Sequence, residues 1–228
     1  MNAKRHRSLS ACGIAALFCV GLAPVAAADG NQPTAFPDTG LLGQQWWQLV
    51  MSIPGPLNPF LDNTGANCGI GQRGNTWFLY SSSFGPRVDL RCTIPAGKTI
   101  FLAVVAGICV PYPGETIPQN VEFCREGGDL TDLVSLRIDG KARNDLIERR
   151  AIYNAFALPV PEDNVFGFAP GIFVAVHDGF FAKVPPLSPG HHTIRVRGAI
   201  SAFGFSTDTL YRLHIVKPDK TLPSVPGP

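Results

Sequence analysis

The chain has 228 residues, of which 45% are hydrophobic, and its 19 basic and 17 acidic residues give a formal net charge of +2. This near-neutral balance argues against a nucleic-acid-binding protein, which would need a basic stripe or patch. The length is that of one ordinary domain with a sizeable core.

Residues 1–28 have the three parts of a signal peptide. Basic residues near the start are followed by an apolar middle at residues 10–22 and by a small-residue cleavage signal at residues 26–28. We expect a mature N-terminus at Asp29, so that cleavage leaves 200 residues with a net charge of −1. The later sequence has no apolar run long enough to span a bilayer. We therefore expect a secreted or periplasmic protein without a transmembrane helix.

Behind the signal peptide, the composition suggests one domain with short extensions. We expect a flexible leader at residues 29–37, a single domain at residues 38–217 and a disordered tail at residues 218–228. No internal repeat or shift in composition divides the middle segment.

The first regular element is an expected amphipathic helix that follows the leader. Its apolar residues share one stripe of a 3.6-residue period: Leu42, Trp46, Leu49, Val50 and Ile53. Asp38 or Thr39 can cap its start, and the Pro-Gly-Pro sequence at residues 54–56 ends it. Because Trp47 falls off this stripe, we expect Trp46 to be the core anchor and Trp47 to be the more exposed neighbour. Trp47 is then either open to a ligand or, as we favour, covered by a second layer.

A glycine-rich loop is predicted after this helix. Asn, Asp, Gly and Pro are dense in residues 58–74, which indicates turns. Residues 69–74 match the G-x-G-x-x-G pattern of dinucleotide-binding proteins, but that motif needs a preceding strand and a following helix. Here a cysteine-containing loop precedes the pattern and an aromatic strand follows it, so we interpret the glycines as a loop.

The rest of the chain predicts many short strands. The segments with strand-like patterns are residues 76–80, 88–94, 99–106, 134–139, 152–160, 173–184, 192–197 and 211–216. The run at residues 99–106 is apolar throughout, which predicts burial on both faces. Asp139-Gly140 and Asp178-Gly179 are predicted hairpin turns. The expected fold is mostly β: an antiparallel β-sandwich or jelly roll with one N-terminal amphipathic helix.

The cysteines that remain after cleavage are Cys68, Cys92, Cys109 and Cys124. An even number in an exported protein favours two disulfides. Of the three possible pairings, the shortest loops favour Cys68–Cys92 and Cys109–Cys124. A four-thiolate zinc site is the alternative, but no C-x-x-C pair is present and an oxidising compartment disfavours free thiolates. We therefore expect no metal and no cofactor.

Four sequence patterns occur together in this chain. They are WWQ at residues 46–48, D-x-T-G-x-x-C at 62–68, G-Q-x-G-x-x-W-F-L at 71–79 and P-L-S-P-G-x-H-T-I at 186–194. Together they resemble a group of exported bacterial β-rich proteins of unknown function, over most of the mature chain. The resemblance supports a β-rich fold and implies no catalytic residue.

The common catalytic motifs are absent from the sequence. It contains neither G-x-S-x-G nor H-E-x-x-H, and paired cysteines would leave no thiol nucleophile. The acid–base candidates that remain are Asp62, Asp163, His177 and Asp178. Asp62 and Asp163 lie in turn-like sequences, which is the simpler explanation for both. His177-Asp178 stands at an expected hairpin tip.

Two functions from different classes are expected. The first is a polysaccharide-binding or structural module whose ligand-binding residues are Trp47, Gln48, Asn67, Gln72 and Trp77. The second is a secreted polysaccharide hydrolase or lyase with an Asp/His acid–base site. The expected partner is a polysaccharide or an envelope protein, and not nucleic acid. The sequence decides neither whether the protein is an enzyme nor what its oligomeric state is.

Overall fold

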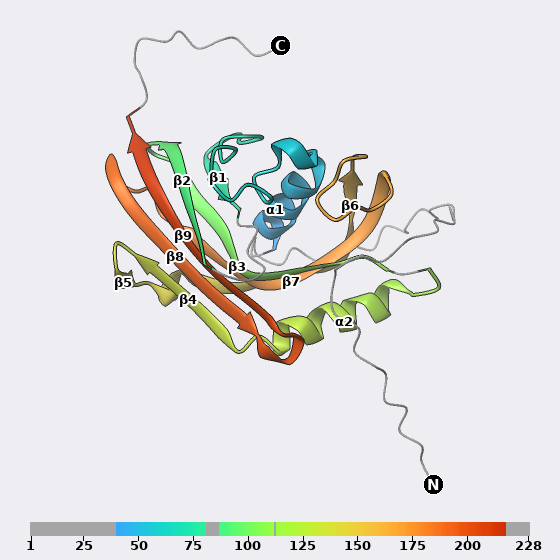
Figure 1. Cartoon of the computed structure of the whole chain (residues 1–228). Coiled ribbons are helices and arrows are strands. Elements are labelled where there is room, and N and C mark those ends of the chain that lie inside the picture. Colours follow the sequence, from blue (N-terminus) through green and yellow to red (C-terminus); the bar gives the residue numbers. More distant parts are fainter. Residues whose placement is uncertain (1–39, 81–86, 112, 218–228) are drawn as a thin grey trace.

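The computed structural model describes residues 40–80, 87–111 and 113–217. Within these ranges the chain is mostly β, with two mixed sheets and two α-helices, α1 (Leu41–Ser52) and α2 (Ile117–Asp129) (Figure 1). The expectation of a single helix is wrong, because α2 forms behind a capping box at Thr116. Neither of these described helices is long and apolar enough to cross a membrane. The expected signal peptide, leader, tail and helix-cap residues Asp38 and Thr39 lie outside the described residues.

The first sheet has the strand order β1-β3-β7-β6. Its strands are β1 (Thr76–Leu79), β3 (Thr99–Cys109), β6 (Ile147–Val160) and β7 (Gly171–Val184). β1 pairs with β3 in parallel, whereas β7 pairs antiparallel with both β3 and β6.

The second sheet has the strand order β2-β9-β8-β4-β5. Its strands are β2 (Val88–Pro95), β4 (Leu133–Ile138), β5 (Lys141–Ala142), β8 (Gly190–Ile200) and β9 (Phe205–Val216). Short 3-10 turns lie at Gly55–Leu57, Asn144–Leu146 and Ser201–Phe203. Because β2 runs parallel to β9, the second sheet is mixed like the first, whereas its other strand pairs are antiparallel, as expected.

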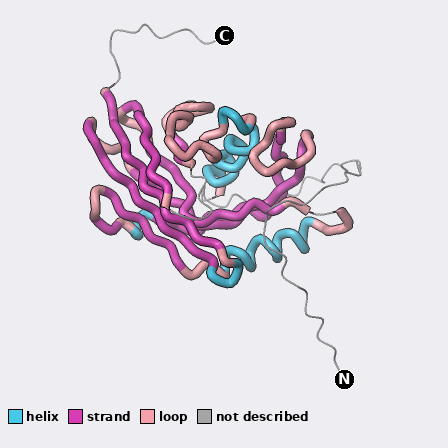
Figure 2. Tube along the Cα trace, in the orientation of Figure 1, coloured by secondary structure: helices cyan, strands magenta, loops and turns pink. Residues whose placement is uncertain are grey.

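The strands of the two sheets are long and curved, as Figure 2 shows. The face of the first sheet that carries Phe101 and Phe181 packs on α1. The opposite face packs on the second sheet at the Ala182 end of β7 and on α2 further along the strand, near Val176. In Figure 1, α1 and α2 accordingly lie on opposite sides of β7.

Strand β3 belongs to both hydrophobic cores. Ile100 and Leu102 point into the core between the two sheets, whereas Phe101 points into the core under α1. All three side chains are fully buried. The prediction that this apolar run is buried on both faces is confirmed.

Helix α1 is buried on more than the one stripe that its periodicity predicts. Trp46 donates a hydrogen bond from Nε1 to the carbonyl of Leu79 at 2.9 Å, and the Trp46 and Trp47 rings meet edge to face. Trp47 is only 4% exposed, so the interpretation that a second layer covers it is confirmed and the alternative of an exposed Trp47 is wrong. The reason is that α1 packs against β6 as well as against β3 and β7.

The two Asp-Gly sequences adopt different structures. Asp139 and Gly140 both have positive φ and join β4 to β5, so this predicted turn is confirmed. Asp178 and Gly179 lie in the middle of the continuous strand β7, so the predicted second hairpin is wrong. Gly179 allows close approach of β3, since a Cβ there would lie 2.6 Å from the Cα of Ala106.

Both expected disulfides are present. Cys68–Cys92 joins the glycine-rich loop to β2, and Cys109–Cys124 joins β3 to α2. The Cα atoms are 5.8 Å apart in each pair, within the usual range for a disulfide.

A buried carboxylate of the sheet is paired with an arginine that also contacts α2, because Arg149 donates to Asp129 and to the carbonyl of Arg125 as well. The Asp178 side chain is fully buried and accepts hydrogen bonds from Arg149 Nε at 2.9 Å and Nη2 at 2.6 Å. Tyr153 donates its hydroxyl hydrogen to the same carboxylate at 2.5 Å. Gly128 of α2 gives the carboxylate room, because a Cβ there would lie 2.8 Å from Oδ2. Asp178 is thus a satisfied structural anion.

We predict that Asp178→Asn lowers the free energy of unfolding by about 2 kcal/mol, because it weakens the charge-assisted hydrogen bonds from Arg149 and Tyr153, while Arg149 keeps Asp129 as a partner. Urea unfolding followed by tryptophan fluorescence, with the disulfides intact, measures this loss. Asp163→Asn, at an exposed loop position, is the matched control and should change stability by less than about 0.5 kcal/mol. Equal stability of the two variants would contradict the structural role of Asp178.

Candidate functional site

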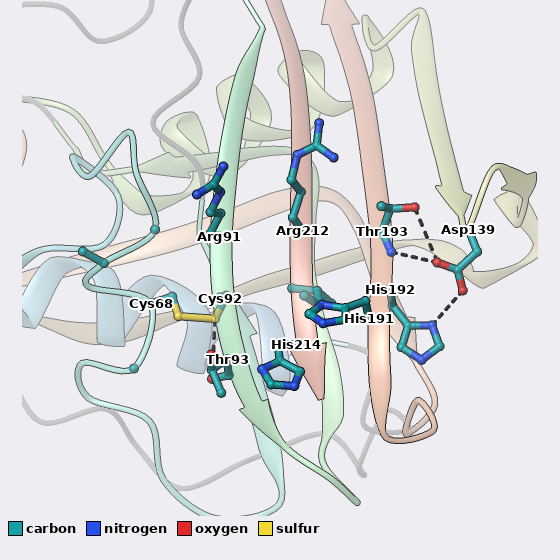
Figure 3. Close-up of a pocket in the computed structure, with 14 residues that line it drawn as sticks. Cys68, Arg91, Cys92, Thr93, Asp139, His191, His192, Thr193, Arg212 and His214 are labelled. Atoms are coloured by element: carbon teal, nitrogen blue, oxygen red, sulfur yellow. Dashed lines mark hydrogen bonds and ion pairs between the residues drawn. A yellow bond between two sulfur atoms is a disulfide. The ribbon is translucent and has the colours of Figure 1, made fainter. Parts of the chain in front are cut away.

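A groove of about 790 Å³ lies on the five-stranded sheet, on the face turned away from the core (Figure 3). Its floor is formed by β2, β9 and β8. One wall comes from the loop at residues 65–69, which the Cys68–Cys92 disulfide ties to β2, and the other includes Asp139 at the β4–β5 turn. The groove therefore stands on a rigid base, which favours precise placement of its side chains.

Strand alternation explains which side chains reach the groove. On β9, Tyr211 and Leu213 are buried while Arg212 and His214 are exposed, as expected for residues on opposite faces of a strand. The registers of β2 and β8 with β9 then align the exposed residues in two cross-strand rows. The histidine row consists of Thr93, His214 and His191, and the arginine row of Arg91, Arg212 and Thr193.

The histidine row contains a stacked pair of imidazoles. His191 and His214 are direct cross-strand neighbours, and their rings lie 4.6 Å apart at an angle of 14°. Both residues are exposed to the groove. Within the described part of the chain, no cluster of three or more His, Cys, Asp or Glu residues is arranged to hold a metal ion.

The arginine row places two cations side by side. Arg91 and Arg212 are direct cross-strand neighbours, an arrangement that is destabilising for like charges. Arg212 has a counter-ion, because its Nη2 lies 3.0 Å from Oδ2 of Asp89. Arg91 forms no ion pair with any of the residues that the structure describes. Its guanidinium is therefore available to a ligand.

Next to the groove, His192 connects Asp139 to Ser188 in an order that resembles a Ser-His-Asp triad. Its Nδ1 lies 2.7 Å from Oδ2 of Asp139, and its Nε2 lies 3.2 Å from the Ser188 hydroxyl. The same Nε2 is 3.0 Å from the Ser188 carbonyl oxygen. The trio was missed at the sequence level, where only the Asp139-Gly140 turn and the S-P-G-x-H spacing hinted at it.

The hydrogen bonds of this trio favour a structural role. A carbonyl oxygen can only accept, so its contact requires a proton on Nε2, and the carboxylate likewise favours a proton on Nδ1. The hydrogen bond that His192 donates to Asp139 is the main cause that raises the pKa of His192, with a further contribution from the Ser188 carbonyl. With the proton on Nε2 in place, this nitrogen has no lone pair to accept a proton from the serine hydroxyl. The trio therefore joins the β4–β5 turn to the loop before β8. We call the contacts of His192 with Asp139 and Ser188 the His192 lock.

The two candidate residues on β7 lie on opposite faces of the sheet. His177 is fully buried next to Gly43 of α1, with Nε2 3.1 Å from the carbonyl oxygen of Gly40. Burial lowers the pKa of His177 to about 4, so its imidazole is neutral at ordinary pH. Asp178 points instead towards α2. The two side chains do not form an acid–base pair.

The other two acid–base candidates lie in loops. The Asp62 carboxylate accepts backbone hydrogen bonds from Thr64 at 2.8 Å and Asn67 at 2.7 Å, which is the turn geometry expected for this residue. Asp163 is exposed, and its backbone carbonyl accepts a hydrogen bond from Gly55. The structure does not bring these residues together with His177 or Asp178.

The expected ligand-binding residues contribute to packing and loop structure. Trp47 is buried and Trp77 is half-buried against the core between the sheets. Gln48 donates to a carbonyl of β6, and Gln72 donates to carbonyls of its own loop and of β1. Asn67 donates its backbone N–H within the loop. None of the five is among the described residues that line the groove.

The groove residues were not singled out in the sequence as a binding site. They come from three strands, and only the alternation of Arg212 with Leu213 and His214 on β9 marks an exposed polar face. No protein-family model matches this chain, and no curated protein matches it significantly. The chemistry of the groove is therefore argued from its own residues.

We predict that the His192 lock stabilises the fold most in mildly acidic solution. The pKa of His192 is raised above its ordinary 6.5, so its contribution is fully present below 6.5 and is lost as the pH rises through the folded value. Burial acts to raise the pKa of Asp139, but hydrogen bonds from His192 and Thr193 outweigh it and lower that pKa below 3.8. The Asp139 contribution is thus lost only in stronger acid.

Unfolding free energies of the wild type and His192→Gln, measured in urea across this pH range, test the lock. The difference between the two proteins should be largest between about pH 4 and pH 6.5 and should shrink above it. Comparing the two proteins removes the opposite pH dependence of His177, which both retain. A difference that does not change with pH would show that His192 carries no charge in the lock.

Proposed function

We propose that the protein is an exported, disulfide-stabilised module that binds a polysaccharide in the groove of the five-stranded sheet. The observation that carries this proposal is the row of Arg91, Arg212 and Thr193 beside the stacked histidines. These side chains offer many hydrogen-bond donors on a rigid, open surface. A surface of this kind suits a long hydroxyl-rich ligand that passes through the groove.

Export is supported by the signal-peptide pattern at residues 1–28 together with the two disulfides, which are typical of oxidising compartments. We propose that the mature protein is secreted or periplasmic, as in the bacterial group that its sequence patterns resemble. We also propose that its two packed sheets form a β-sandwich, in which the groove occupies an outer face.

The acidic group of the groove favours a binding function over hydrolysis, because it is already engaged in contacts within the protein. Asp139 is the one carboxylate among the described residues that line the groove, and it is already engaged by His192 and Thr193. A glycosidase of the usual kind needs two carboxyl groups facing each other across its substrate. The lyase alternative keeps one supporting observation, since His191 and His214 stand next to arginines that could neutralise a charged sugar.

We predict that Arg91→Gln weakens polysaccharide binding roughly 10- to 100-fold, which is the effect of losing a charge-assisted hydrogen bond of about 1.5–3 kcal/mol. Affinity electrophoresis of the mature protein through gels that contain soluble polysaccharides measures the change. Arg197→Gln is the matched control, because Arg197 is exposed on β8 but does not line the groove.

Identical retention of the two arginine variants would contradict the proposed site. The same samples should be assayed for new reducing ends and for the ultraviolet absorbance of unsaturated sugars. Retention without products supports a binding module, whereas unsaturated products would show that the lyase alternative is correct.

A further inference from the structure

We infer that the ligand of the groove is an acidic polysaccharide, a polyuronate whose carboxylates lie against Arg91 and Arg212 and whose binding is coupled to protonation of the histidine pair. This inference rests on the proposed polysaccharide-binding function and specifies its ligand class. It is argued from the charges of the sheet face, from their cross-strand positions and from the stacked imidazoles.

The outer face of the five-stranded sheet carries a local excess of positive charge. The arginines that are exposed or half-exposed on its strands are Arg91, Arg137, Arg195, Arg197 and Arg212. Two aspartates on the same strands, Asp89 and Asp208, form ion pairs with Arg212 and Arg195. Because the whole chain is nearly neutral, this excess is a property of one surface and not of the protein.

The positions of these arginines are not those that stability alone would favour. Arg91 stands directly opposite Arg212, and Arg137 stands directly opposite Arg195. Like charges in such positions destabilise a sheet, whereas an opposite pair such as Arg197 and Asp208 stabilises it. An anion placed between Arg91 and Arg212 would remove their repulsion. The unfavourable pair in the groove thus indicates an anionic ligand.

A carboxylate is the anion that fits these groups best among those a polysaccharide carries. The guanidinium is planar and can donate two parallel hydrogen bonds to the two oxygens of a carboxylate. The next row of side chains lies two residues further along the strands, about 7 Å away, and neighbouring strands are about 5 Å apart. A chain ligand that occupies the groove therefore meets donors in both rows.

The histidine row makes the affinity of the groove for its ligand depend on pH. Histidine is the side chain whose charge ordinarily changes between about pH 5 and pH 8. The charged groups that line the groove beside the pair are Arg91 on β2, Arg212 on β9 and the Asp139–His192 ion pair. Two stacked imidazolium rings would repel each other and both arginines.

A bound polyanion would offset this repulsion, so that binding takes up protons. By linkage, the affinity for the polyanion must then rise as the pH falls. A neutral polysaccharide would leave the repulsion in place and would not show this increase. The pH dependence therefore distinguishes an acidic ligand from a neutral one.

The test compares polygalacturonate with its methyl ester, which keeps the same backbone and lacks the charge. Binding to the mature protein is measured by isothermal titration calorimetry at about pH 5.5 and about pH 8. We expect at least roughly tenfold tighter binding of the acid than of the ester, and tighter binding of the acid at the lower pH. The double variant His191→Gln/His214→Gln should bind the acid with a weaker pH dependence than the wild type, since it keeps only His192 in the groove, and Arg197→Gln should behave as the wild type.

The outcomes separate the two proposals. Equal binding of the acid and the ester would overturn this inference but would leave the proposed function standing. Failure to bind either form or any glycan in the wider panel would overturn the proposed function. Tighter binding of dextran sulfate or of single-stranded nucleic acid than of polygalacturonate would overturn the assignment of a polyuronate, as would an unchanged pH dependence in the double histidine variant.

Discussion

The burial of Ile100, Phe101 and Leu102 on opposite faces of β3 is the constraint on which the rest of the structure depends. Its alternating apolar side chains require one partner layer on each side, and these layers are the five-stranded sheet and helix α1 (Figure 1). Further along the same sheet, α2 covers the face that the second sheet leaves. The outer face of the five-stranded sheet is then left to present polar side chains, and the groove lies there.

Three groups of charged residues differ in whether their charges are balanced by partners within the protein. Under α2, the Asp178 carboxylate is saturated by Arg149 and Tyr153. At the edge of the groove, His192 is saturated by an aspartate and a carbonyl. In both places the charge is compensated within the protein, which is how a buried or structural ion is normally held. Arg91 and Arg212 are direct cross-strand neighbours, but only Arg212 has a counter-ion, Asp89. Arg91 is therefore the charge that an anionic ligand would balance.

The sequence predicted what depends on local pattern. The positions of most strands, the Asp139-Gly140 turn and the two disulfide pairs follow from periodicity, turn residues and loop length. The predictions from sequence were wrong where contacts with a distant segment determine the local structure. Helical periodicity places Trp47 off the apolar stripe, but β6 covers it. The groove depends on the register of β2 with β9, which places Arg91 beside Arg212. These two residues are far apart in the sequence, so no local pattern predicts their pairing.

The most direct test of the central claim is a nuclear magnetic resonance titration of the isotope-labelled mature protein with a short oligogalacturonate. If the groove is the binding site, the imidazole signals of His191 and His214 and the guanidinium signal of Arg91 should shift with a common saturation curve. The indole signals of the buried Trp47 and half-buried Trp77 should stay in place. Shifts of the indole signals, with the imidazole and guanidinium signals unmoved, would contradict the account and return the site to the tryptophan stretch.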